Sequence, residues 1–147
     1  MKYILILIVG FIALRLYLIK QAAERFVFAI GKASNIKIIG GSVQWTQGLL
    51  VSNGDNIAVT INGANLVNII NNREIGSCIL LNRQTIPARS AQTQILFQVV
   101  VPLTDLVFLG LGVLDAIQNR KLTMTIKGYI SSSGFDVPLN KTFTVQK

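Results

Sequence analysis

The apolar segment near the N-terminus constrains this chain more than any other feature of its sequence. Seventeen residues separate Lys2 from Lys20, and Arg15 is the one charged residue among them. A helix that is apolar on all sides is stable only where water is excluded from it. A bilayer core needs a helix of about 20 residues, with roughly 17 as the lower limit. We therefore predict an uncleaved membrane-anchor helix.

The predicted anchor includes Arg15, because a long side chain near the end of a span can reach the interface. The predicted anchor residues are Tyr3, Ile4, Leu5, Ile6, Leu7, Ile8, Val9, Phe11, Ile12, Leu14, Arg15, Leu16, Tyr17, Leu18 and Ile19. A cleaved export signal and a buried core helix are the alternatives. Cleavage requires small residues, and "IKQAAER" places Lys20 or Gln21 where a small residue is needed.

The helix is expected to continue beyond the anchor. The stretch "QAAERFVFAIGKA" contains good helix formers, and Gly31 with Ser34-Asn35 are stop signals. The predicted organisation is an N-terminal membrane-anchor helix over residues 1–33, followed by a β-sandwich domain over residues 34–147.

Basic residues flank the anchor unequally. Lys2 precedes it, whereas Arg15, Lys20, Arg25 and Lys32 lie near its end or after it. Basic residues are enriched on the cytoplasmic side of membrane spans. We therefore predict a single-pass membrane protein whose C-terminal domain lies on the cytoplasmic side, or on the shell side of a particle.

Alternating hydrophobicity predicts that the rest of the chain is antiparallel β-structure. In "KLTMTIKGYI", apolar residues Leu122, Met124, Ile126 and Ile130 alternate with polar ones. Similar alternation marks "NIKIIG", "NIAVTING", "TQILFQVVVP" and a final pair, "FDVPLN" and "KTFTVQ". Turn signals separate these runs at residues 40–41, 52–56, 71–72, 87–90 and 131–134. The pattern is typical of an antiparallel β-sandwich of about seven strands, with one buried face per strand.

One segment of the body has helical rather than strand periodicity. The stretch "PLTDLVFLGLGVLDAIQNRK" spaces Leu103, Leu106, Val107, Leu114 and Ile117 at helical intervals. It predicts a helix of about three turns that begins after Pro102, although Gly110 and Gly112 weaken it. The alternative is a membrane-touching surface, since the apolar run 106–114 is too short to span a bilayer.

The residue types needed for most catalytic sites are missing or dispersed. The sequence has no histidine, so it offers no histidine-based acid–base catalysis and no histidine-ligated metal. Its six acidic residues are scattered, and Asp55 in "SNGDN" is interpreted as a turn residue rather than a Ca²⁺ ligand with Asn53 and Asn56. Ser132 has no base to activate it. We predict no enzymatic activity, no cofactor and no small-molecule substrate.

Two further residues are interpreted structurally. Cys78, the single cysteine, lies in the apolar stretch "SCILL" and is predicted to be a buried, inert thiol. Trp45 is predicted to pack in the core. Residues 1–33 carry half of the net charge of +8, and the other +4 is dispersed over the body, where Arg120-Lys121 is the one adjacent basic pair, so nucleic acid is not an expected partner.

Residues 36–145 resemble the late-embryogenesis-abundant type 2 domain, also called the water-stress-and-hypersensitive-response domain. The resemblance rests on "VTINGANLVNIINNREIGSCILLNRQTIPARSAQTQILFQVVVPLTDL", "LTMTIKGYI" and "VPLNKTFTV". Its marks here are Ile75-Gly76, Pro87-Ala88, Pro102-Leu103 and Ile126–Ile130. The resemblance implies a seven-stranded type of sandwich that is non-enzymatic and often preceded by a membrane anchor.

The expected function is that of a non-enzymatic, membrane-anchored β-sandwich acting as a structural or interaction module. Its expected partners are the lipid bilayer and other proteins. One alternative is a structural membrane protein of a lipid-containing virus particle, which would link an internal bilayer to the capsid shell. A second alternative is a stress-protective, chaperone-like module.

Overall fold

A computed structural model of the protein describes residues 2–110 and 123–144, with side chains described from residue 8 to residue 142 within those ranges. These ranges contain two helices, α1 (Lys2–Glu24) and α2 (Leu103–Phe108). Their strands are β1 (Val27–Ile39), β2 (Ser42–Asn53), β3 (Val59–Ile61), β4 (Gly63–Ile70), β5 (Arg73–Leu80), β6 (Gln84–Ile86), β7 (Ser90–Pro102), β8 (Thr123–Ser132) and β9 (Phe135–Thr144).

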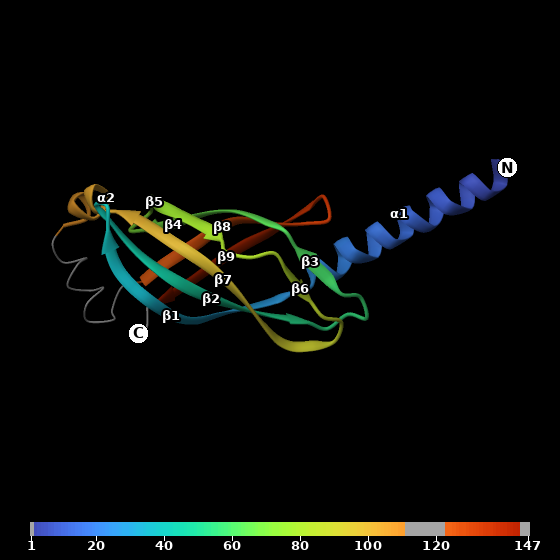
Figure 1. Ribbon diagram of the computed structural model, residues 1–147, viewed down its shortest axis with the longest axis horizontal. Coiled ribbons are helices and arrows are strands. Elements are labelled where there is room, and N and C mark those ends of the chain that lie inside the picture. Colours follow the sequence, from blue (N-terminus) through green and yellow to red (C-terminus); the bar gives the residue numbers. More distant parts are fainter. Residues whose placement is uncertain (1, 111–122, 145–147) are drawn as a thin grey trace.

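The body is an elongated, curled sheet, from one end of which α1 projects (Figure 1). Seven strands pair in the order β1-β2-β7-β5-β4-β8-β9, and every pairing is antiparallel. The edge strands β1 and β9 contact each other, so the sheet curls around its own core. Strands β3 and β6 form a second small sheet near α1. The predicted mainly antiparallel β-structure is confirmed.

The core occupies the inside of the curl because one face of each long strand is apolar. On β7, Ile95, Phe97, Val99 and Val101 are all buried, as their alternation predicts. The same holds for Met124, Ile126 and Ile130 on β8, whereas Leu122 lies outside the described residues. Trp45 on β2 is buried among them, which confirms its predicted core position.

The predicted helical continuation after residue 24 is wrong. Helix α1 ends at Glu24, and residues 27–39 form β1, so position 33 lies inside a strand. Pairing with β2 stabilises these residues as a strand more than their helix propensity stabilises a helix. The pairing runs from Val27 opposite Ser52 to Ile39 opposite Ser42.

Strand β1 also differs from the predicted burial pattern. Ile36 and Ile38 were expected on a buried face, but Ile38 is 67% exposed and Ile36 is exposed as well. β1 is an edge strand with register shifts after Ile30 and after Ser34. The second half of β1 lies beyond these register shifts. Its side chains are exposed, because no described residue packs against them.

Two further expectations need correction. The predicted final pair of strands is one continuous strand, β9, whose Pro138 is tolerated because β9 is a sheet edge. The predicted three-turn helix after Pro102 is only six residues long, because Gly110 follows its end and Leu109 N–H donates to the carbonyl of Leu106. The rest of that prediction, including Gly112, Leu114 and Ile117, lies outside the described residues.

The predicted turns all connect strands. Residues 40–41 join β1 to β2, residues 71–72 join β4 to β5, and residues 133–134 join β8 to β9. Residues 54–58 and 87–89 form longer loops at the end of the sheet from which α1 projects. These loops and the β8–β9 turn surround the junction between α1 and the body.

Candidate functional site

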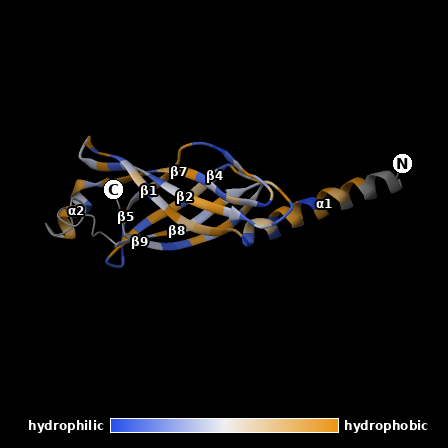
Figure 2. Ribbon diagram, turned by 90° about the horizontal axis from the view of Figure 1, so that it is seen from below, coloured by the Kyte–Doolittle hydropathy of each residue, from blue (hydrophilic) through white to orange (hydrophobic). Residues whose placement is uncertain are grey.

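Helix α1 exposes apolar side chains around its whole circumference. Phe11 is 65% exposed, and Val9 and Tyr17 are each 59% exposed. Successive helical residues are about 100° apart, so these positions and their exposed neighbours face different directions. Figure 2 shows the helix as a mostly hydrophobic rod outside the body. Among the residues whose side chains the structure describes, no helix is long and apolar enough to cross a membrane.

The last turns of α1 attach the helix to the sheet. Ala22 and Ala23 are buried, and Ile19 packs against the same core cluster. Small side chains at these positions allow the helix backbone to approach β9 and β3 closely. Phe26 follows immediately and is buried too, with its ring edge-on to that of Phe28 at 6.2 Å between centroids. The attachment therefore depends on the residues closest to β1.

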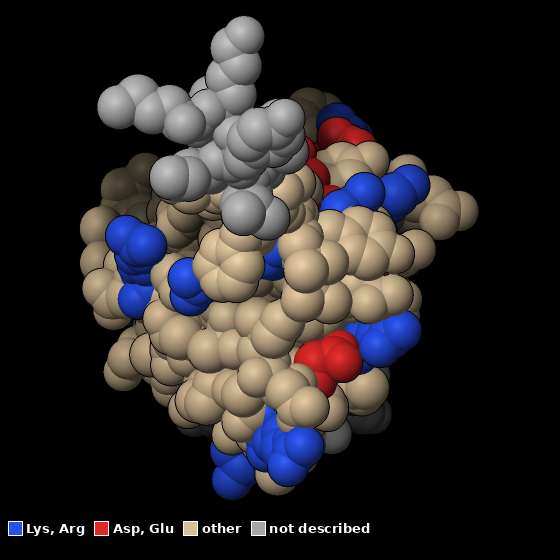
Figure 3. Space-filling view, turned by 90° about the vertical axis from the view of Figure 1, so that its right-hand side faces the viewer, with Lys and Arg blue, Asp and Glu red and all other residues tan. Residues whose placement is uncertain are grey.

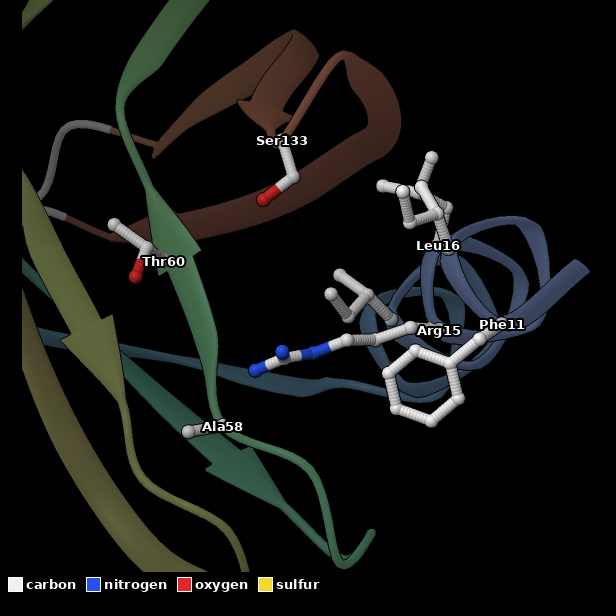
Figure 4. Close-up of a pocket in the computed structure, with 8 residues that line it drawn as sticks. Phe11, Arg15, Leu16, Ala58, Thr60 and Ser133 are labelled. Atoms are coloured by element: carbon white, nitrogen blue, oxygen red, sulfur yellow. The ribbon is translucent and has the colours of Figure 1, made fainter. Parts of the chain in front are cut away.

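A cleft of about 430 Å³ lies between α1 and the sheet, just before this attachment. The helix contributes one wall and the β3 region with the β8–β9 turn contributes the other (Figure 4). The lining residues are Phe11, Ile12, Arg15, Leu16, Ile19, Ala58, Thr60 and Ser133. Volumes of about 300–1,000 Å³ are usual for sites that bind small molecules. The cleft therefore has the dimensions of a ligand site.

Arg15 is the charged residue of the cleft. Its side chain leaves α1 and extends across the gap toward Ala58, with Phe11 beside its stem (Figure 4). No carboxylate lines the cleft, and Arg15 has no hydrogen-bond or ion-pair partner among the described residues. A guanidinium offers five N–H donors in a planar fork that matches carboxylate and phosphate oxygens. The arrangement suits an anion.

Two residues that carry hydroxyl groups, Thr60 and Ser133, line the same cleft from the sheet. The Thr60 hydroxyl is already paired with that of Thr85 across the small sheet, at 2.8 Å. Ser133, at the tip of the β8–β9 turn, has no hydrogen-bond partner within the described part of the chain. The neighbouring Ser132 is instead buried and donates to the carbonyl of Thr60 at 2.7 Å. Ser133 is therefore the hydroxyl left free to meet a ligand.

Three other basic residues at this end of the body have partners. Lys20 lies 3.8 Å from Glu24 on α1, and Arg25 lies 3.3 Å from Asp55. Arg89 donates to the side-chain oxygen of Asn56. Figure 3 looks onto this end and shows basic side chains spread around it, with acidic ones beside some of them. Arg15 thus differs from these neighbours in facing a cavity without a partner.

Asn53 organises the loops around the junction. Its side-chain nitrogen donates to the carbonyls of Ile57 at 2.8 Å and Pro87 at 3.0 Å. Its side-chain oxygen accepts from the N–H of Asp55 at 3.0 Å. The turn predicted around Asp55 is therefore held by the Asn53 side chain, whereas the Asp55 carboxylate pairs with Arg25. No cluster of metal-ligating residues occurs among the described residues.

Cys78 lies far from the cleft in the core. It is buried, as predicted, and its thiol donates to the side-chain oxygen of Asn68 at 3.0 Å. Burial raises the pKa of Cys78 to about 12, although the hydrogen bond to Asn68 acts in the opposite direction. A thiol in this state is neutral and a poor nucleophile at neutral pH.

One wall of the cleft consists of predicted anchor residues, whereas the other wall was not predicted from the sequence. Five of its lining residues belong to the predicted anchor, namely Phe11, Ile12, Arg15, Leu16 and Ile19. Ala58, Thr60 and Ser133 come from positions 40 to 120 residues further along the chain, and no sequence pattern connects them with Arg15. A second cavity of about 340 Å³ lies between Phe26, Phe28 and β9 and is not predicted either.

Comparisons with known proteins concern the fold alone. No protein-family model matches this chain, and no curated protein matches it significantly. A protein from Archaeoglobus fulgidus of known crystal structure is 14% identical, with a TM-score of 0.46, over 83% of this chain and 96% of its own. A Northeast Structural Genomics Consortium target solved by X-ray diffraction is also 14% identical, with a TM-score of 0.46, over 82% and 84%.

Proposed function

We propose that this protein is a non-enzymatic structural or interaction module that α1 anchors in a lipid bilayer. One observation carries the proposal: residues 8–18 of α1 are all exposed and, apart from Arg15, uncharged, with Phe11, Val9 and Tyr17 more than half exposed. Exposed apolar surface that is continuous marks a membrane or protein interaction site. The apolar sequence of the proposed anchor begins at Tyr3, and its described side chains begin at Ile8.

Charge placement supports the same proposal. The apolar run ends at Lys20, and Arg25 follows within two turns of chain. Basic residues next to a membrane span interact with anionic headgroups, at about 1 kcal/mol per residue near the surface. The end of the body beside α1 would then face the bilayer, with its longer loops at the surface.

The opposite end of the body is the proposed contact site for other proteins. Ile38 and Ile39 on edge strand β1 are exposed, as are Val107 and Phe108 on α2. The Arg73 guanidinium carbon lies 5.0 Å from the centre of the Phe108 ring. An exposed edge strand and apolar side chains are features of protein interfaces. We also propose that residues 36–145 are related to late-embryogenesis-abundant type 2 domains, which they resemble in sequence. A binding role agrees with that relationship.

The virion and stress-protection alternatives use the same anchor and body with different partners. No contact among the described residues favours either of them. Both require the membrane association that the following experiment tests.

Membrane association tests the proposal directly. Substituting Val9→Lys and Ile12→Lys together places two charges in the middle of the apolar run. Each lysine costs roughly 2.5–3.5 kcal/mol at the centre of a membrane helix. We expect the wild-type chain to float with lipid vesicles and to resist alkaline extraction, and the double variant to be lost from the vesicle fraction.

A matched control adds the same charge elsewhere. Ile38→Lys with Val107→Lys replaces two exposed apolar residues at the far end of the body. This control is expected to float as the wild type does. A wild-type chain that stays free of vesicles, or a Val9/Ile12 variant that floats equally well, would contradict the proposed anchor.

A further inference from the structure

Arg15 is a lone positive charge near the end of the proposed membrane helix, where it needs an anionic partner. It is the one charged residue between Lys2 and Lys20, and it lies about 7.5 Å before Lys20 along the helix axis. An arginine close to the end of a span can raise its guanidinium to the headgroup layer. In this protein that guanidinium extends into the cleft beside α1 (Figure 4).

We propose that the cleft binds the phosphodiester headgroup of an anionic phospholipid. The Arg15 guanidinium would pair with the phosphate oxygens, and Ser133 on the opposite wall would contact the rest of the headgroup. Phe11, Ile12 and Leu16 would contact the glycerol and the upper part of the acyl chains. This inference rests on the proposed membrane anchor and assigns the anchor a specific lipid contact.

The walls of the cleft favour a lipid over a free phosphate ion. A single exposed arginine binds a free phosphate weakly, since water competes for both charges. The cleft adds apolar side chains from α1, and burial of apolar surface against them stabilises only a ligand that has an apolar part. A phospholipid headgroup with its glycerol and first methylene groups presents both chemistries together.

The absence of an acidic residue from the lining also matters. Lys20 and Arg25 lie near the cleft, but Glu24 and Asp55 neutralise them. Arg15 has no such partner among the described residues, so an anion in the cleft meets uncompensated positive charge. An anionic lipid should therefore bind better than a zwitterionic one, whose choline would meet no carboxylate there.

Lipid retention by the full-length protein in non-ionic detergent tests the inference. The protein is titrated with phosphatidylglycerol or phosphatidylcholine, and bound lipid is counted by native mass spectrometry. We expect phosphatidylglycerol to bind preferentially to the wild type. Arg15→Leu keeps the helix apolar but removes the guanidinium, and should weaken phosphatidylglycerol binding roughly tenfold.

A second variant changes the cleft without changing α1. Ala58 is exposed and lines the wall of the cleft opposite α1, so Ala58→Glu adds a carboxylate to that wall. It should reduce phosphatidylglycerol binding by a similar factor, roughly tenfold, through competition for Arg15 and repulsion of the phosphate. Ala88→Glu is the matched control, because Ala88 is also exposed in a loop at this end but does not line the cleft.

Lys20→Gln is the control for Arg15→Leu. It removes one positive charge from the same helix, at a side chain that pairs with Glu24 outside the cleft. Both controls should retain phosphatidylglycerol as the wild type does. Equal loss in Ala58→Glu and Ala88→Glu would overturn the inference, since surface charge alone would then explain lipid preference.

Two further measurements separate the possible failures. Flotation on vesicles of pure phosphatidylcholine measures anchoring without any anionic headgroup, and Ala58→Glu should float fully there. Failure of the wild type to float contradicts the anchor itself, whereas flotation without phosphatidylglycerol preference contradicts only the lipid site. Inorganic phosphate at the same concentration should not displace the lipid, and displacement would show that the apolar walls contribute nothing.

Discussion

At the scale of single residues, buried polar side chains explain features that hydrophobicity cannot. Gln47 lies in the core and donates to the carbonyls of Gly31 at 2.8 Å and Gly48 at 3.0 Å. The first bond satisfies a carbonyl of β1 between Ile30 and Ala33, where the register shifts. A buried amide at this position therefore holds the edge strand in its irregular path.

Cys78 and Asn68 form a second buried polar pair. The Asn68 side-chain oxygen accepts from the thiol, whereas its side-chain nitrogen has no partner within the described residues. The thiol is neutral in the folded protein because burial penalises the thiolate more than the hydrogen bond favours it. The sequence prediction of an inert thiol follows from the same apolar surroundings.

Alkylation measures this state of Cys78. Its folded pKa of about 12 lies above the ordinary value of 9.0, so the neutral thiol is retained as pH rises through 9. At pH 10 about one hundredth of folded molecules would hold a thiolate. We expect iodoacetamide to leave Cys78 unmodified in the native protein between pH 8 and pH 10, and to modify it fully in denaturant, as read by mass spectrometry.

The same shift has a consequence for stability. Above pH 9 the thiol keeps its proton in the folded state but loses it in the unfolded state. The contribution of the neutral thiol to the free energy of unfolding is therefore fully present below pH 9. It is lost as pH rises toward 12, at up to about 1.4 kcal/mol per pH unit. Rapid alkylation of the native protein at pH 8 would contradict both the burial and the shift.

At the scale of elements, one glycine sets the path of β5. The pairing of β4 with β5 shifts between Val67 and Asn68, and Gly76 is the extra residue on the β5 side. It has φ of +61°, and a Cβ there would lie 2.1 Å from the carbonyl oxygen of Val100. A bulge with this conformation and this close approach requires glycine.

Substituting Gly76→Ala tests the bulge. The added methyl group meets backbone on β7 and also disfavours the positive φ, so neither side can relax easily. We expect the free energy of unfolding to fall by more than about 2 kcal/mol. Gly54→Ala is the control, since nothing lies within 4 Å of its Cβ position, and it should change stability by less than about 0.5 kcal/mol. Denaturation followed by fluorescence of buried Trp45 measures both, and equal effects would contradict the role of Gly76.

The edge strands show why element boundaries were hard to predict. Residues 27–33 contain helix formers, yet they pair with β2 and complete the sheet beside α1. In β9, Pro138 suggests a break, yet the strand continues because its far side has no neighbour in the sheet order. Both outcomes depend on which strand lies next to the segment, and local sequence does not contain that information.

At the scale of the whole molecule, the protein is an apolar helix attached to one end of a curled β-body. The attachment is short, through Ala22, Ala23 and Phe26. Residues 1–33 have five basic side chains and Glu24, a net charge of +4, which is half of the total of +8. Half of the net positive charge therefore lies within or directly beside the proposed anchor, where it would meet the lipid headgroups.

Orientation across the membrane is the prediction that belongs to this scale. The excess of basic residues after the apolar run predicts that the body lies on the cytoplasmic side. Ser34→Cys introduces an exposed thiol on β1, and buried Cys78 adds no background. In intact cells that express the full chain, a membrane-impermeant maleimide should label Ser34→Cys only after the membrane is opened. Labelling of intact cells would contradict this orientation.

The sequence by itself determined the periodicities of this protein. Apolar residues on every face of residues 3–19 predict a helix, and alternation in β7 and β8 predicts buried strand faces, because both patterns are local consequences of backbone geometry. Only the tertiary structure decided that β1 begins at Val27, that Gly76 must have no side chain, and that Ala58 and Ser133 line the same cleft as Arg15. These outcomes depend on contacts between segments distant in sequence, and such contacts leave no periodic signal in either segment alone.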